Sequence, residues 1–135
     1  MLKIVIDVRR ARDFGIGTYI RNLVHALSGV DHANRYELVA FAEDKKLLGG
    51  LPSNFEFIPY NRRDTDPWGN VAFPLFLRGF VPDLVHIPLN RVPLLMPKPY
   101  VVTIHDMASL LFEEASGLRI RFRRFRFRRH NRPAR

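Results

Sequence analysis

Two neighbouring residues, His105 and Asp106, have side chains that could act directly on a bound substrate. They follow an apolar run, residues 100–104, that is typical of a β-strand. A neutral imidazole there can hydrogen-bond a substrate hydroxyl or assist proton transfer, and the carboxylate can orient it or cap the next segment. The alternative is a histidine that only completes the strand by pairing with backbone. We predict no metal site, because adjacent strand residues point to opposite faces.

A pair of glycines, Gly15 and Gly17, flanks Ile16 just before a segment with helical periodicity. Glycine lets a backbone approach a phosphate closely, and a helix start offers unpaired N–H groups with partial positive charge. We therefore expect residues 15–17 to lie near a diphosphate, although a simple turn with positive φ would also explain the glycines. A nicotinamide dinucleotide is disfavoured because the third glycine of the usual fingerprint is replaced by Ile20.

Further polar or aromatic side chains could line a pocket for an acceptor molecule. They lie at or just after the ends of predicted strands, except for Tyr19, which lies on the first predicted helix. The arginines that follow the first strand could contact an anionic acceptor, while solvated surface arginines are the ordinary alternative. The remaining candidates could equally serve loop structure or packing. The candidates are Arg9, Arg10, Arg12, Tyr19, His86 and Asn90.

Strand and helix patterns alternate along the sequence. Apolar runs predict strands at residues 2–7, 36–41, 55–58, 83–87 and 100–104. Apolar residues at helical spacing predict a first helix with one buried stripe, formed by Ile20, Leu23, Val24 and Leu27, and with Gly29 as its cap.

Proline marks the second predicted helix. A cap at Asp66 followed by Pro67 predicts that this helix starts there. Pro74 should interrupt it or begin another helix that ends near Gly79, and a last helix is expected over residues 118–133. The alternation predicts an α/β fold: a Rossmann-like parallel sheet flanked by helices, whose ligands gather at the carboxyl ends of the strands.

The composition indicates a globular protein with one domain. Its 135 residues are 47% hydrophobic and 26% charged. Cysteine is absent, which excludes disulfides and thiolate metal sites and fits a cytoplasmic location. The net charge of +9 belongs to a tail, because residues 119–135 hold nine of the 22 basic residues and none of the 13 acidic ones. We therefore divide the chain into a domain at residues 1–117 and a basic segment at residues 118–135.

The basic segment has three possible roles. It could be a domain helix with a solvated face, a contact with an anionic membrane surface, or an RNA-binding segment that uses arginine and phenylalanine. A membrane contact would place the protein peripherally on the inner face of the membrane. The residues for that contact are Arg119, Arg121, Arg123, Arg124, Arg126, Arg128 and Arg129.

Several of these pieces, in their order and spacing, resemble the N-terminal domain of family-4 (group 1) glycosyltransferases of the GT-B fold. The similar segments are residues 4–10, 15–23, 68–74, 82–86 and 101–112, within a resemblance that covers roughly residues 2–129. The resemblance implies retaining transfer of a sugar from a nucleotide-sugar donor to a glycan or lipid-linked acceptor, with no other cofactor. It also implies that His105 and Asp106 are catalytic, and that Gly15, Ile16 and Gly17 approach the donor diphosphate.

In that family a C-terminal half binds the nucleotide and supplies a paired-glutamate motif, which this sequence lacks. We therefore expect a truncated enzyme or a half-enzyme that is inactive alone and needs a separate donor-binding domain. Two other functions remain as alternatives: a membrane- or nucleic-acid-associating module, and a plain Rossmann-type nucleotide binder.

Overall fold

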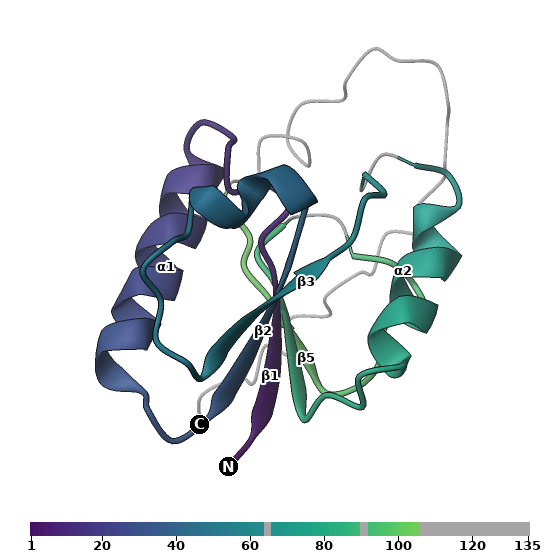
Figure 1. The fold of residues 1–135 in the computed structure, drawn as a ribbon. Helices are drawn as coiled ribbons and strands as arrows, with labels where there is room; N and C mark the ends of the chain where they lie inside the picture. The colour runs from purple at the N-terminus through teal and green to yellow at the C-terminus, as the bar shows by residue number, and fades with distance from the viewer. Residues whose placement is uncertain (64–65, 90–91, 106–135) are drawn as a thin grey trace, which may run out of the picture.

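Five parallel strands form the central sheet of the computed structural model, which describes residues 1–63, 66–89 and 92–105. Their spatial order is β3-β2-β1-β4-β5 (Figure 1). The predicted α/β, Rossmann-like class is therefore confirmed, although the last strand ends two residues earlier than predicted. The strands are β1 (Lys3–Asp7), β2 (Arg35–Ala40), β3 (Phe55–Pro59), β4 (Leu84–Ile87) and β5 (Tyr100–Val102).

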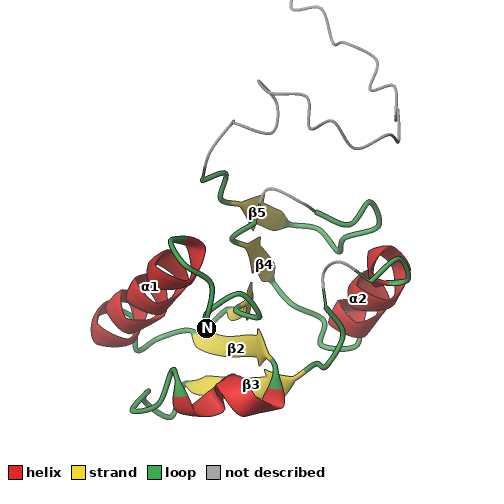
Figure 2. Cartoon of the chain, turned by 90° about the horizontal axis from the view of Figure 1, so that it is seen from above, coloured by secondary structure: helices red, strands yellow, loops and turns green. Residues whose placement is uncertain are grey.

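Helices α1 (Ile16–Val30) and α2 (Gly69–Arg78) cover opposite faces of this sheet, as Figure 2 shows. β1 lies between them and alternates its side chains between the two cores. Ile4 and Ile6 pack on the side of α1, and Val5 packs on the side of α2. A continuous apolar run is what a strand covered on both faces requires. Neither helix in the described part of the chain is long and apolar enough to cross a membrane.

Helix α1 carries the predicted apolar stripe but ends differently from the prediction. Ile20 and Val24 are fully buried, and Leu27 packs against the same core. Gly29 was wrongly predicted to cap the helix: it lies inside α1, which continues to Val30. The helix closes instead through the backbone N–H of Asp31, which donates to the carbonyl of Leu27 at 2.9 Å.

Helix α2 begins later than predicted and runs through its proline. The side chain of Asp66 accepts the N–H of Trp68 at 3.0 Å, and the helix starts at Gly69. The prediction that Pro74 breaks this helix was wrong. Pro74 is buried beside Phe73 on the face that packs against the sheet. Packing of this face therefore outweighs the one backbone hydrogen bond that proline removes.

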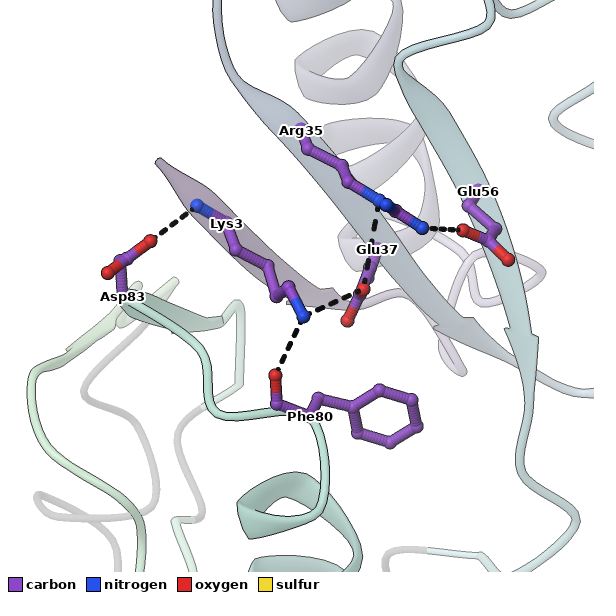
Figure 3. Close-up of polar contacts among 6 residues, drawn as sticks. All are labelled: Lys3, Arg35, Glu37, Glu56, Phe80 and Asp83. Carbon is purple, nitrogen blue, oxygen red and sulfur yellow. Dashed lines mark hydrogen bonds and ion pairs between the residues drawn. The ribbon is translucent and has the colours of Figure 1, made fainter. Parts of the chain in front are cut away.

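Charged residues tie strands together at the amino edge of the sheet, opposite the edge where ligands are expected (Figure 3). The Glu37 carboxylate is almost completely buried and lies 3.7 Å from Lys3 Nζ and 3.9 Å from the guanidinium of Arg35. Lys3 also donates to the carbonyl of Phe80 at 2.9 Å, and its backbone N–H donates to Asp83. These contacts fix the segment between α2 and β4 against β1.

A short 3₁₀ helix, η1 (Ala42–Lys46), follows β2 at the carboxyl edge of the sheet.

The predicted helix over residues 118–133, and with it the whole basic segment, lies outside the described residues.

Candidate functional site

A cluster of four side chains lies where α1, β4 and β5 meet. Tyr19 comes from the first turns of α1, His86 from β4, and Thr103 and His105 from the segment after β5. We call these four residues the histidine cluster. Thr103 Oγ1 lies 3.1 Å from Tyr19 Oη and 2.8 Å from His86 Nε2, so it joins the two side chains by hydrogen bonds.

The position of His105 is fixed by two further contacts. Its ring meets that of Tyr19 edge-on, with centroids 4.8 Å apart and planes at 76°. Its Nε2 lies 3.2 Å from the carbonyl oxygen of Pro88, and a ring N–H at this position donates to that oxygen. A held imidazole of this kind can receive a hydroxyl proton from a ligand.

The pKa of His86 is lowered from its ordinary value of 6.5, first because burial disfavours the imidazolium and then because His105 would repel it. His86 therefore stays neutral where a free histidine begins to protonate. A neutral His86 lets the hydroxyl of Thr103 donate to its Nε2 while Thr103 Oγ1 accepts from Tyr19. Tyr19, Thr103 and His86 then form a hydrogen-bonded chain at the carboxyl edge.

This lowered pKa predicts a pH-dependent stability. The unfolded chain takes up a proton at His86 as the pH falls below about 6.5, whereas the folded chain resists it, so stability should fall with pH in that window. Urea unfolding at pH 7.5 and 5.5 should show a larger loss in the native chain than in a His86→Gln variant. Equal losses in the two proteins would contradict the prediction.

The structure gives a different reason for the presence of each glycine in the turn before α1. Gly15 adopts φ 75°, which other residues rarely adopt, and a side chain there would meet open space. A Cβ on Gly17 would lie only 2.6 Å from the carbonyl oxygen of Ala11. The N–H groups of Ile16 and Gly17 donate to the carbonyls of Phe14 and Asp13. The turn is thus closed largely by its own backbone, and the predicted diphosphate contact stays a prediction.

Substituting alanine for Gly17 should lower the free energy of unfolding by about 1–3 kcal/mol, because the loop backbone must move to admit a methyl group. Gly29→Ala is the matched control, since a Cβ at that helical position meets nothing within 4 Å and alanine is the better helix former. Thermal or urea unfolding measures both variants. Equal stability of the two variants would show that the close approach at Gly17 is unimportant.

A second candidate site is a cavity of about 550 Å³ at the carboxyl ends of β1, β2 and β3. Its walls are the loop after β1, the segment after β2 that includes η1, and the loop after β3. We call it the arginine cavity, because four guanidinium groups contribute to its lining. The lining residues are Arg9, Arg10, Arg12, Asp13, Phe41, Glu43, Asp44, Asn61 and Arg63.

Three of the predicted acceptor-binding residues, Arg9, Arg10 and Arg12, line this cavity, and each is already paired with a carboxylate. Arg9 is only 7% exposed and binds Asp7 through two parallel hydrogen bonds of 2.8 and 2.7 Å. Its third contact, at 2.8 Å, is with the carbonyl of Arg62 in the loop after β3. Arg10 pairs with Asp13 at 2.7 Å. The structure thus gives Arg9 a role in holding two loops together.

The structure brings together only some of the predicted site residues. Tyr19, His86 and His105 meet in the histidine cluster, and Arg9, Arg10 and Arg12 meet in the arginine cavity. Asp106, Asn90 and the seven arginines of the predicted membrane contact lie outside the described residues. The described ranges contain no group of three or more histidine and acidic side chains that could hold a metal ion.

Sequence reasoning missed three residues that build these sites: Thr103, Asp44 and Arg63. Thr103 could have been found, since it lies two residues before His105 at a predicted strand end. Asp44 gave no signal, because a charged residue in a polar segment is ordinarily solvated, yet it is 1% exposed.

Comparisons with models of protein families, with curated proteins and with solved structures give no match for this chain.

Proposed function

We propose that this chain is the acceptor-side half of a retaining glycosyltransferase, which moves a sugar from a nucleotide-sugar donor to an acceptor hydroxyl. The observation that supports this most directly is the histidine cluster, where a held His105 lies at the carboxyl edge beside the turn that opens α1. That edge is where open α/β sheets bind their ligands. The residues of this region are also those that resemble the glycosyltransferase family.

In this proposal the cluster receives the acceptor. The imidazole of His105 approaches the hydroxyl that becomes bonded to the sugar, and Asp106 supports it. Tyr19, His86 and Asn90 shape the pocket, and residues 15–17 come close to the donor diphosphate. The nucleotide itself is held by a separate C-terminal donor-binding domain, so the chain is inactive alone. It works in the cytoplasm on a glycan or a lipid-linked acceptor.

The test uses the full 135-residue chain labelled with ¹⁵N. Candidate sugar acceptors should shift the amide signals of Tyr19, His86, Thr103 and His105, and His105→Ala should weaken binding by up to about tenfold, the value of one hydrogen bond. Thr18→Ala, on the same helix but exposed, is the control. Transfer or hydrolysis of nucleotide sugars by the chain alone at an ordinary enzymatic rate would overturn the half-enzyme proposal.

A second candidate function rests on the sequence of residues 119–135, where three phenylalanines are interspersed among nine arginines. Here the chain associates with an anionic membrane surface, or alternatively with RNA, through this basic segment. Vesicles with and without anionic lipid, and a single-stranded RNA, should be compared as ligands of the native chain and of a full-length variant with seven arginines changed to glutamine. Unchanged binding by the variant would eliminate this function.

A further inference from the structure

We propose that the arginine cavity is a binding site for an anionic oxygen group of the phosphate class, contacted by Arg12 and Arg63. The identification of that ligand as the acceptor of the sugar transfer rests on the proposed function, whereas the anion site itself does not. The cavity lies at the carboxyl ends of β1, β2 and β3, and the histidine cluster lies around β4 and β5. Both lie along the carboxyl edge of the sheet.

The first support is the way in which Arg12 is held. Its side chain is 58% exposed, but its Nε is paired with the carboxylate of Asp44, which is 1% exposed. Its Nη2 also donates to the carbonyl of Glu43 at 3.0 Å. A buried carboxylate that holds an exposed guanidinium fixes the direction of that guanidinium before a ligand arrives. Such preorganisation reduces the entropy lost on binding.

Arg63 supplies the cation that is not neutralised. Its neighbour Arg62 pairs with Asp66 at 2.9 Å and is not part of the cavity wall. Arg63 does line the cavity, and within the described ranges its guanidinium makes no ion pair. Its backbone is anchored, because its carbonyl accepts the N–H of Asp66 at 3.2 Å. This arginine is therefore placed at the wall with its charge available.

The hydrogen-bond donors of this wall favour an anion as the ligand. Of the four lining arginines, three are paired with carboxylates, Arg9 with Asp7, Arg10 with Asp13 and Arg12 with Asp44, so that Arg63 and Glu43 are the charged lining residues that have no ion pair within the described ranges. Each guanidinium carries five N–H donors and no acceptor, so hydrogen-bond donors exceed acceptors in this wall. Planar guanidinium groups match the geometry of phosphate and carboxylate oxygens, and they repel cations.

The experiment titrates the ¹⁵N-labelled full chain with inorganic phosphate, glucose 6-phosphate and glucose at 150 mM salt, which limits weak attraction to the basic segment. We expect the two phosphate compounds, but not glucose, to shift amide signals in residues 9–13, 41–44 and 61–63. Tighter binding of glucose 6-phosphate than of inorganic phosphate identifies a phosphate ester as the ligand, and equal binding identifies free phosphate. Both results support the anion site.

Arg63→Gln should raise the dissociation constant for phosphate by at least about tenfold, the value of one charged hydrogen bond. Arg63→Lys should have a smaller effect, because it keeps the charge but loses the planar fork. Arg78→Gln is the matched control, since it removes an exposed arginine at the far end of α2 and should leave the dissociation constant unchanged.

Three results would overturn the anion site: shifts confined to residues 119–135, glucose binding as tightly as glucose 6-phosphate, or no difference between the Arg63 variants and the Arg78 control. The proposed function fails separately. Phosphate bound in the cavity without any sugar transfer by the enzyme completed with its donor domain would remove the glycosyltransferase and leave the anion site. Transfer to a neutral acceptor, with no shifts in the cavity, would do the reverse.

Discussion

Replacing Arg9 with methionine should lower the free energy of unfolding by about 3–5 kcal/mol, because it leaves the carboxylate of Asp7 buried without its cation. The two side chains are 6% and 2% exposed, so water cannot replace the missing partner. Arg9 also lies over the ring of Phe73, with its guanidinium carbon 4.0 Å from the ring centroid. Domains of this size are stable by only about 5–15 kcal/mol, so the loss is a large part of the total.

The measurement is urea unfolding followed by circular dichroism. The matched control is the double variant Asp7→Asn with Arg9→Met, in which no buried charge is left alone. It should be more stable than Arg9→Met by itself. A loss below about 1 kcal/mol in the single variant, as for exposed ion pairs, would contradict a buried pair.

A loss of similar size, about 3–5 kcal/mol, is expected for Phe73→Ala, which empties the centre of the core between α2 and the sheet. Phe73 is 2% exposed and packs with Leu77, Val85 and Ile87. Its ring also carries the contact with Arg9, so its removal affects both the core and the buried ion pair. The same unfolding measurement applies.

Two further variants make the Phe73 result interpretable. Phe14→Ala removes an aromatic ring that is fully exposed, and it should change stability by less than about 0.5 kcal/mol. Phe73→Leu keeps most of the buried volume but removes the ring beneath Arg9, so its stability should lie between those of Phe73→Ala and Phe14→Ala. A Phe73→Ala variant as stable as Phe14→Ala would show that this core is not packed as described.

The sequence was sufficient for the parts of the fold that depend on local periodicity. The run at Ile4, Val5 and Ile6 predicted a strand with two covered faces, and the spacing of Ile20 and Val24 predicted the buried face of α1. Pro74 was interpreted wrongly because its local preference opposes the packing of the whole helix. Local rules alone cannot weigh a lost hydrogen bond against burial in a core that forms from distant segments.

The sites were predicted only in part, for a similar reason. Strand ends could be recognised, and this was enough to find His86 and His105, whereas Tyr19 was found on the first predicted helix. That Thr103 would join two of them depends on the register of β4 and β5, which pairs His86 with Val101. The burial of Asp44 and the pairing of Arg9 with Asp7 depend on how loops fold back over the sheet. No periodic pattern carries that information.

The segment between β1 and α1 has a consequence for variation and for engineering. Four of its eight residues, Arg9, Arg10, Arg12 and Asp13, line the arginine cavity, and the segment leads directly into the turn of α1 that carries Tyr19. A single short loop thus has to satisfy the arginine cavity, the placement of Tyr19 and one buried ion pair at once. Paired substitutions in this loop and in the histidine cluster should therefore be non-additive, with the second change having an effect that depends on the first.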